Sequence, residues 1–265
     1  MNVLSKTNRA ILSEMVRTDF KLRYQNSVLG YLWSLLRPLF ISAIMYIVFV
    51  SFLKIGDDIR HKAAYLLLGI MCWTFFIEVT TGAVGSVVAK GDLIRKIAIP
   101  RYITVVSASV SALINFCFNL AVLGGVMLIS GTEVRAGDLW MVPLLLGLLY
   151  VLSLAIAFIL AAMFVKFRDV SFIWDVITQM LFYLTPILYP ADLALSRFGA
   201  AKYLFLNPLA EIIQQLRYIL VTPQAVTASH VLGDGAFIPL FVVILIGLFS
   251  VWYFRREARF FAENV

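Results

Sequence analysis

The chain has 265 residues, of which 62% are hydrophobic and 14% are charged, and its formal net charge is +7. Soluble domains usually have about a quarter of their residues charged, so this composition excludes an ordinary soluble core and favours a bilayer as the solvent. The positive charge does not indicate nucleic-acid binding, because the basic residues cluster beside apolar segments, where they set the topology of a membrane protein.

The first predicted element is an amphipathic helix from about residue 8 to residue 24. Apolar residues recur there at helical spacing, with Arg9, Arg17 and Lys21 on the opposite side. Such a helix lies in the membrane interface, with its apolar face toward lipid and its basic face toward headgroups or a partner. A plain surface anchor is the alternative. We expect the chain to bend near Arg37 and Pro38, because a residue before proline avoids helical geometry.

Hydrophobic runs of about 20 residues are long enough to cross a bilayer. Six such runs follow, at residues 35–53, 63–89, 103–130, 139–165, 170–190 and 237–255. The predicted fold is therefore an all-α integral membrane protein with six transmembrane helices. No linker divides the chain, so we expect a single transmembrane domain over residues 1–265. Its parts are a cytoplasmic interface helix within 1–34, a six-span region over 35–255 and a cytoplasmic tail over 256–265.

Charge predicts the orientation of these spans. Six spans place both termini on one side, and if that side is the cytoplasm, 15 of the 22 lysines and arginines lie inside. The positive-inside rule then places both termini in the cytoplasm.

The first inside loop reads VAKGDLIRKIAIPRYI, residues 88–103. Its apolar residues alternate with basic ones between Gly91 and Pro100, and Asp92 can cap a short helix. The loop is either a docking segment for a soluble protein or an ordinary basic loop that sets topology, and its spacing favours neither.

Between the fifth and sixth spans the chain reads LTPILYPADL and then NPLAEIIQQLRYIL. The prolines break the fifth span, and the second stretch is too short and polar to cross a bilayer. We expect short external helices here that lie at, or dip into, the outer interface, packed on protein or lining water.

Few residues in the spans carry chemistry. Glu78 and Asp175 are charged groups inside predicted spans, and such groups usually mark function or a buried pair. Arg168 can pair with Asp175 from two turns away. Cys72 and Cys117 lie in apolar runs and are interpreted as small buried hydrophobes. The sequence contains no phosphate-binding loop of the G-x-x-x-x-G-K-[ST] type, and both histidines fall in predicted external loops.

Two predicted spans carry polar and aromatic stripes. Aromatic faces with interspersed hydrogen-bonding groups suit sugar rings, although helix packing explains any single residue equally well. The stripe in the fifth span includes Asp175, Thr178, Gln179, Phe182, Tyr183 and Tyr189, and that in the first includes Ser42, Tyr46 and Phe49.

The order of these motifs resembles one known family. RTDFKLRYQNSVLGYLWSLLRP resembles the N-terminal signature of ABC-2-type transporter permeases that export polysaccharides, such as O-antigen, capsule or teichoic acid. LIRKIAIPRYI looks like the first cytoplasmic coupling segment of that family, and FRDV like its second cytoplasmic loop. LTPILYP followed by NPLAEII is similar to its fifth span and external re-entrant helices. The resemblance covers essentially the whole chain.

The resemblance implies a transport subunit that is not itself an enzyme. Two copies of the chain would form a pore, and two separate ABC ATPase subunits would bind ATP and magnesium, so this chain would hold no cofactor or metal. The substrate would be a lipid-linked glycan, O-antigen type first, and the location the inner membrane of a bacterium. The alternatives are a permease for capsule or teichoic acid, one for drugs or small lipids, and a membrane enzyme acting on lipid-linked sugars.

The resemblance also assigns roles to residues. The interface helix would present Arg17, Lys21, Arg23 and Tyr24. ATPase coupling would fall to Leu93, Ile94, Arg95, Lys96, Pro100, Arg101, Arg168 and Asp169. The substrate channel would be lined by Tyr31, Trp33, Ser42, Tyr46, Phe49, Asp175, Gln179, Phe182, Tyr183 and Tyr189.

Overall fold

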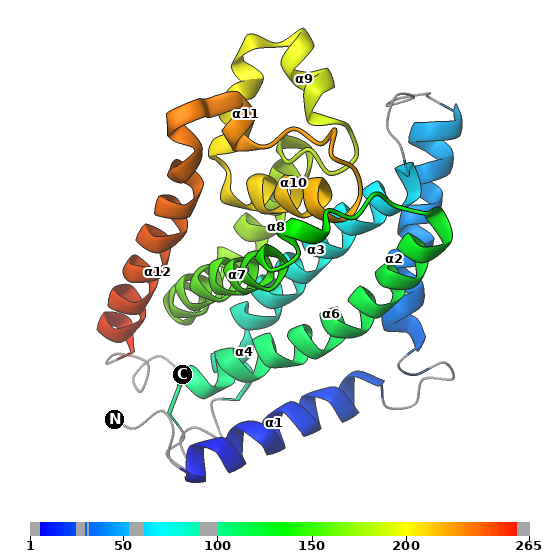
Figure 1. Ribbon diagram of the computed structural model, residues 1–265. Coiled ribbons are helices and arrows are strands. Elements are labelled where there is room, and N and C mark those ends of the chain that lie inside the picture. The colour runs from blue at the N-terminus through cyan, green and yellow to red at the C-terminus, as the bar shows by residue number, and fades with distance from the viewer. Residues whose placement is uncertain (1–5, 25–29, 31, 53–60, 91–99, 259–265) are drawn as a thin grey trace.

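A computed structural model describes residues 6–24, 30, 32–52, 61–90 and 100–258, and all the secondary structure in these ranges is helical. The side chains of Phe20, Leu22, Arg23, Tyr24 and Phe49 lie outside the described part. Figure 1 shows α1 at one end of a helical bundle and α9, α10 and α11 at the opposite end.

The chain begins with α1 (Lys6–Tyr24), followed by α2 (Leu32–Met45), a π-helical turn η1 (Tyr46–Phe52), α3 (Lys62–Val84) and α4 (Ser86–Ala89). Next come α6 (Tyr102–Ser130), the 3₁₀ turn η2 (Ala136–Asp138), α7 (Met141–Lys166) and α8 (Val170–Leu184). Four short elements follow, α9 (Ala191–Arg197), η3 (Gly199–Leu206), α10 (Pro208–Leu220) and α11 (Ala228–Leu232). The turn η4 (Gly233–Phe237) leads into α12 (Ile238–Glu257).

Five helical segments of the described chain are long and apolar enough to cross a membrane. They are Leu32–Phe52, Lys62–Val84, Tyr102–Ser130, Met141–Lys166 and Ala228–Glu257. The remaining predicted span, residues 170–190, contains α8, which is apolar but has 15 residues and is too short by itself. The six-span count therefore stays a prediction, as do the orientation of the termini and the re-entrant position of the short helices.

Helix α3 forms the centre of the bundle because it is apolar on all sides, as expected of a helix surrounded by others. It packs on α2, α6, α7 and α8. Phe75 of α3 stacks on Phe116 of α6, with 4.4 Å between ring centroids.

The helix ends follow local chemistry. Asn207 caps α10 by accepting a hydrogen bond from the Leu209 N–H at 3.0 Å, and Pro208 occupies the first turn, where no donor is needed. Gly131 ends α6 with φ of 63°. Helix α2 runs continuously through Arg37 and Pro38, so the bend expected there does not interrupt the helix.

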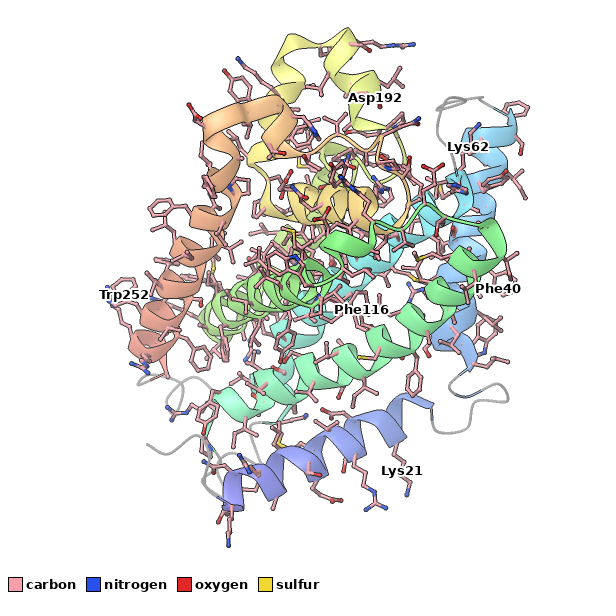
Figure 2. All side chains as sticks on the ribbon, viewed as in Figure 1. Lys21, Phe40, Lys62, Phe116, Asp192 and Trp252 are labelled. Carbon is pink, nitrogen blue, oxygen red and sulfur yellow. The ribbon has the colours of Figure 1, made fainter. Side chains whose placement is uncertain are left out.

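Helix α1 corrects one expectation. The described part of its apolar face packs on the bundle and does not point to lipid, because Met15 is buried against Ile103 at the start of α6, with Ile11 and Leu12 beside it. Figure 2 shows the Lys21 side chain on the side of α1 that faces away from the bundle.

Candidate functional site

Helix α8 separates its predicted stripe into two faces. Asp175, Gln179 and Tyr183 are exposed, whereas Thr178 is buried and Phe182 is half-buried. Phe182 lies 5.5 Å from the Trp73 ring of α3, between centroids. The stripe thus contributes a polar outer face and an inner packing face.

The inner face is anchored by Trp174. Its indole N–H donates to the Thr80 hydroxyl of α3 at 3.2 Å, and its ring lies 6.2 Å from that of Phe76. This contact fixes the rotation of α8, so that Asp175 and Gln179 face outward.

The outer face of α8 combines a carboxylate with large apolar groups. Asp175 lies among exposed Phe172, Val176 and Met180, and Tyr183 is 70% exposed. The expected pairing with Arg168 is not formed in the described part of the chain, where Arg168 instead stacks on the Phe164 ring at 5.2 Å. An ionisable residue on an apolar helix usually faces a water-filled path or a partner rather than lipid.

The segment from α2 to η1 is exposed in a similar way. Trp33 and Tyr46 are exposed, while Pro38 and Ser42 form the buried side against the bundle. Phe40 also lies on the outside, as Figure 2 shows. Ser42 thus faces the bundle rather than the surface that Trp33 shares. Tyr31 and the Phe49 side chain lie outside the described residues.

Glu78 has a partner on a neighbouring helix. The Asn115 side-chain amide on α6 donates to the two Glu78 carboxylate oxygens at 3.1 and 3.4 Å. Polar contacts of this kind hold membrane helices together. This pairing with Asn115 explains why Glu78 lies inside a membrane helix, so its position there does not indicate a catalytic role.

At the end of the bundle opposite α1, Arg217 of α10 is fully buried. Its guanidinium donates to the Tyr65 carbonyl at 3.1 and 3.2 Å, to the Pro186 carbonyl at 2.5 Å and to the Ile187 carbonyl at 2.8 Å. It also lies 3.6 Å from the centroid of the Tyr65 ring. One side chain therefore joins α10 to α3 and to the chain that leaves α8.

Glu211 joins α10 to α11. Its carboxylate accepts from the Ala228 N–H at 2.7 Å and from the Gln215 amide at 2.8 Å. Burial raises the pKa of Glu211 to about 7, and the two hydrogen bonds lower it in part.

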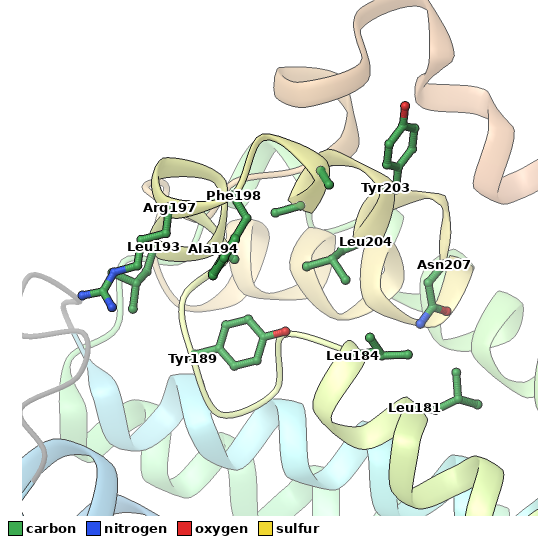
Figure 3. Close-up of a pocket in the computed structure, with 12 residues that line it drawn as sticks. Leu181, Leu184, Tyr189, Leu193, Ala194, Arg197, Phe198, Tyr203, Leu204 and Asn207 are labelled. Carbon is green, nitrogen blue, oxygen red and sulfur yellow. The ribbon is translucent and has the colours of Figure 1, made fainter.

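Figure 3 shows a pocket between the end of α8 and the elements α9 and η3. Its volume is about 620 Å³, and its wall is mostly apolar, with Leu181, Leu184, Leu193 and Leu204 among the lining residues. Tyr189, a predicted channel residue, lines this pocket and donates its hydroxyl to the Tyr183 carbonyl at 3.0 Å. It therefore lies beyond the end of α8, apart from the polar face of Asp175 and Gln179.

At the α1 end of the bundle, Arg168 and Asp169 are exposed at the junction of α7 and α8. Pro100 and Arg101 are half-buried, and Arg101 donates to the Ala258 carbonyl after α12. Leu93, Ile94, Arg95 and Lys96 lie outside the described residues. Arg17 and Lys21 are exposed on α1, and Arg23 and Tyr24 belong to its last turn.

Sequence reasoning missed two sets of residues. Arg217 is among the seven basic residues that the charge count places outside, and that count does not separate a buried cation from an exposed one. Asp19 and Lys90 form an ion pair of 2.7 Å that joins α1 to the end of α4. No spacing rule connects residues so far apart in the chain.

The chain resembles one protein family and several known proteins. The model of the family described as ABC-2 type transporter matches residues 12–221. The O-antigen export system permease protein RfbA of Myxococcus xanthus is 27% identical over 264 residues, covering 97% of this chain and 96% of that protein. A Klebsiella pneumoniae protein of the same name is 27% identical over 207 residues, covering 78% of both chains. A second from Klebsiella pneumoniae is 26% identical over 221 residues, covering 82% of this chain and 84% of that protein.

Proposed function

Because this multi-pass membrane protein belongs to the ABC-2 type transporter family, we propose that it is the permease subunit of an ATP-driven polysaccharide exporter. It moves a lipid-linked glycan of the O-antigen type from the cytoplasm across the bacterial inner membrane. The observation that carries this proposal is the similarity to an O-antigen export permease over 97% of the chain.

The exporter contains two copies of this chain and two ABC ATPase subunits. A second copy is supported by the exposed faces of α2 and α8, because each combines large apolar groups with polar ones. Asp175, Gln179 and Tyr183 face the path of the glycan. There the polar side chains bond to the glycan hydroxyls, and the tyrosine ring stacks on the sugar rings. Trp33 and Tyr46 contribute from α2 and η1.

The ATPase binds at the α1 end of the bundle. Exposed Arg168 and Asp169 and the exposed basic groups Arg17 and Lys21 lie on this end, together with Pro100 and Arg101. The segment that includes Leu93, Ile94, Arg95 and Lys96 connects α4 to α6 and couples ATPase closure to movement of these helices.

Deletion of the gene in its own host tests the function. We expect the surface polysaccharide to disappear and lipid-linked polymer to accumulate in the cytoplasm of the deletion strain. When the chain is purified from the parent strain, we expect an ATPase that carries a phosphate-binding loop to co-purify with it. Transport that persists without any such partner would contradict an ATP-driven exporter. Normal surface polymer with altered drug or lipid efflux would instead favour a permease for small molecules.

A further inference from the structure

Helix α1 contacts the chain on both sides of residues 91–99. Before this segment, Lys90 contacts Asp19 through both carboxylate oxygens, at 2.7 and 2.9 Å. After it, Tyr102 accepts a hydrogen bond from the Asn8 side chain at 3.2 Å, and Ile103 packs on Met15.

The ion pair is partly shielded from water. The side chain of Lys90 is 22% exposed and that of Asp19 is 26% exposed. The Ser107 hydroxyl of α6 lies 3.4 Å from both the Lys90 ammonium and an Asp19 oxygen, so three elements meet at one point. Ion pairs in such surroundings are stronger than fully exposed pairs, which contribute little.

We propose that the Asp19–Lys90 pair is a positioning device that fixes α1 to the ends of α4 and α6, so that these three elements move as one body during transport. The mechanical reason is that the pair joins α1 to α4, while α1 also packs on α6 through an apolar cluster and a side-chain hydrogen bond from Asn8.

The consequence for transport rests on the proposed function. The pair transmits a force applied to α1 to the chain between α4 and α6, and it transmits a force applied to that chain back to α1. When the pair is broken, the ATPase continues to hydrolyse ATP, but less of its movement reaches the bundle. Asp19 and Lys90 therefore position the coupling elements and do not contact substrate.

A charge-swap series tests the docking directly. In full-length chain with Cys72 and Cys117 replaced by alanine, Met15→Cys introduces a thiol that Ile103 covers when α1 is docked. The labelling rate with a membrane-impermeant maleimide is measured in Asp19→Lys, in Lys90→Asp and in the double swap. We expect the labelling rate to rise roughly five-fold in each single variant, because an ion pair of moderate strength has an effect of about this size. In the double swap the labelling rate should return to that of the parent.

The two single variants change the local charge in opposite directions, so a common rise cannot come from thiol reactivity alone. Glu14→Lys is the matched control, because it makes the same charge change as Asp19→Lys on the exposed face of α1. Its labelling rate measures how far this charge change alone alters the reactivity of the introduced thiol. If neither single variant labels faster than this control, the pair does not hold α1 and the proposal is overturned.

The same variants are then measured in the assembled exporter. We expect polymer export per ATP hydrolysed to fall about five-fold in each single variant and to recover in the swap. Labelling that responds while export is unchanged would refute the role in transport but not the docking. Failure of the unmodified chain to export polymer, with labelling as expected, would count against the proposed function alone.

Discussion

At the residue scale, Arg217 shows how one side chain can join distant parts of a membrane protein. Peptide carbonyls that leave a helix end have no partner within the helix, and a buried carbonyl without a hydrogen bond is costly. Arg217 donates to three buried carbonyls, that of Tyr65 in the first turn of α3 and those of Pro186 and Ile187 in the turn that follows α8. Its charge is tolerated because the guanidinium is surrounded by acceptors and one aromatic ring.

We predict that Arg217→Ala lowers stability by about 3–5 kcal/mol, because it leaves buried acceptors unpaired. The thermal midpoint of the purified protein in detergent measures this loss. Arg217→Lys should recover only part of it, since a lysine cannot reproduce the planar arrangement of donors.

Gly69 provides an independent check on the same contact. A β-carbon at Gly69 would lie 2.4 Å from a terminal nitrogen of Arg217, whereas one at Gly124 would meet open space. Gly69→Ala should therefore destabilise the protein by about 1–3 kcal/mol, and Gly124→Ala should not. Equal midpoints for the two variants would show that Arg217 does not occupy this position.

Glu211 gives a prediction for pH. Its folded pKa of about 7 lies above its ordinary value of 4.5, so the folded protein binds the proton more tightly than the unfolded chain. The contribution to stability is therefore complete below pH 4.5 and is lost as the pH rises through 7, by about 3 kcal/mol at most. Glu211→Gln lacks this dependence, so the midpoint of the parent should fall relative to the variant between pH 5 and pH 8.

At the scale of elements, α8 is a helix with two different surfaces. Trp174 and Thr178 pack inward, and Asp175, Gln179 and Tyr183 lie outward. The hydrophobic periodicity of a span cannot separate these surfaces when lipid-facing and protein-facing residues are both apolar. The hydrogen bond from Trp174 to Thr80 makes the distinction.

We predict that Tyr183→Ala and Trp174→Ala have different effects, although both remove an aromatic ring from α8. Tyr183→Ala should keep the thermal midpoint and ATPase association while export falls, because the ring is 70% exposed. Trp174→Ala should lower the midpoint, since it removes a buried ring and a hydrogen bond. If Tyr183→Ala lowers export and association equally, the residue serves packing instead of the substrate path.

At the scale of the whole molecule, the two ends of the bundle differ in construction. The end with α9, α10 and α11 is held by buried polar contacts of Arg217 and Glu211. The end with α1 is held by a partly exposed ion pair and a small apolar cluster. The first arrangement suits a rigid cap, and the second holds α1, α4 and α6 together as a body that can move relative to that cap during a transport cycle.

We predict that Arg95→Glu combined with Lys96→Glu uncouples ATP hydrolysis from export, because the double charge reversal disturbs the segment assigned to the ATPase. The measurements are export, ATPase rate and membrane insertion of the same preparation, with insertion expected to be normal. Normal export in the double variant would remove the segment from the coupling mechanism.

Much of the fold was predictable from the pattern of residues. The helical class, the amphipathic α1 and the apolar helices near residues 35–53, 63–89, 103–130, 139–165 and 237–255 follow from hydrophobic runs and their length. These properties depend on the side chain and its near neighbours in the chain, which the sequence displays directly. The resemblance to ABC-2 permeases could also be found from the sequence, because the motifs and their order are local features of the chain.

The tertiary structure decided which faces are covered and which polar groups meet. It turned the apolar face of α1 onto Ile103, paired Glu78 with Asn115 and Asp19 with Lys90, and placed Arg217 among three carbonyls. None of these contacts is local, because each depends on how helices pack across tens of residues. In an apolar chain the energy of burial is similar for many arrangements, so the few polar contacts and the shapes of the side chains select one of them.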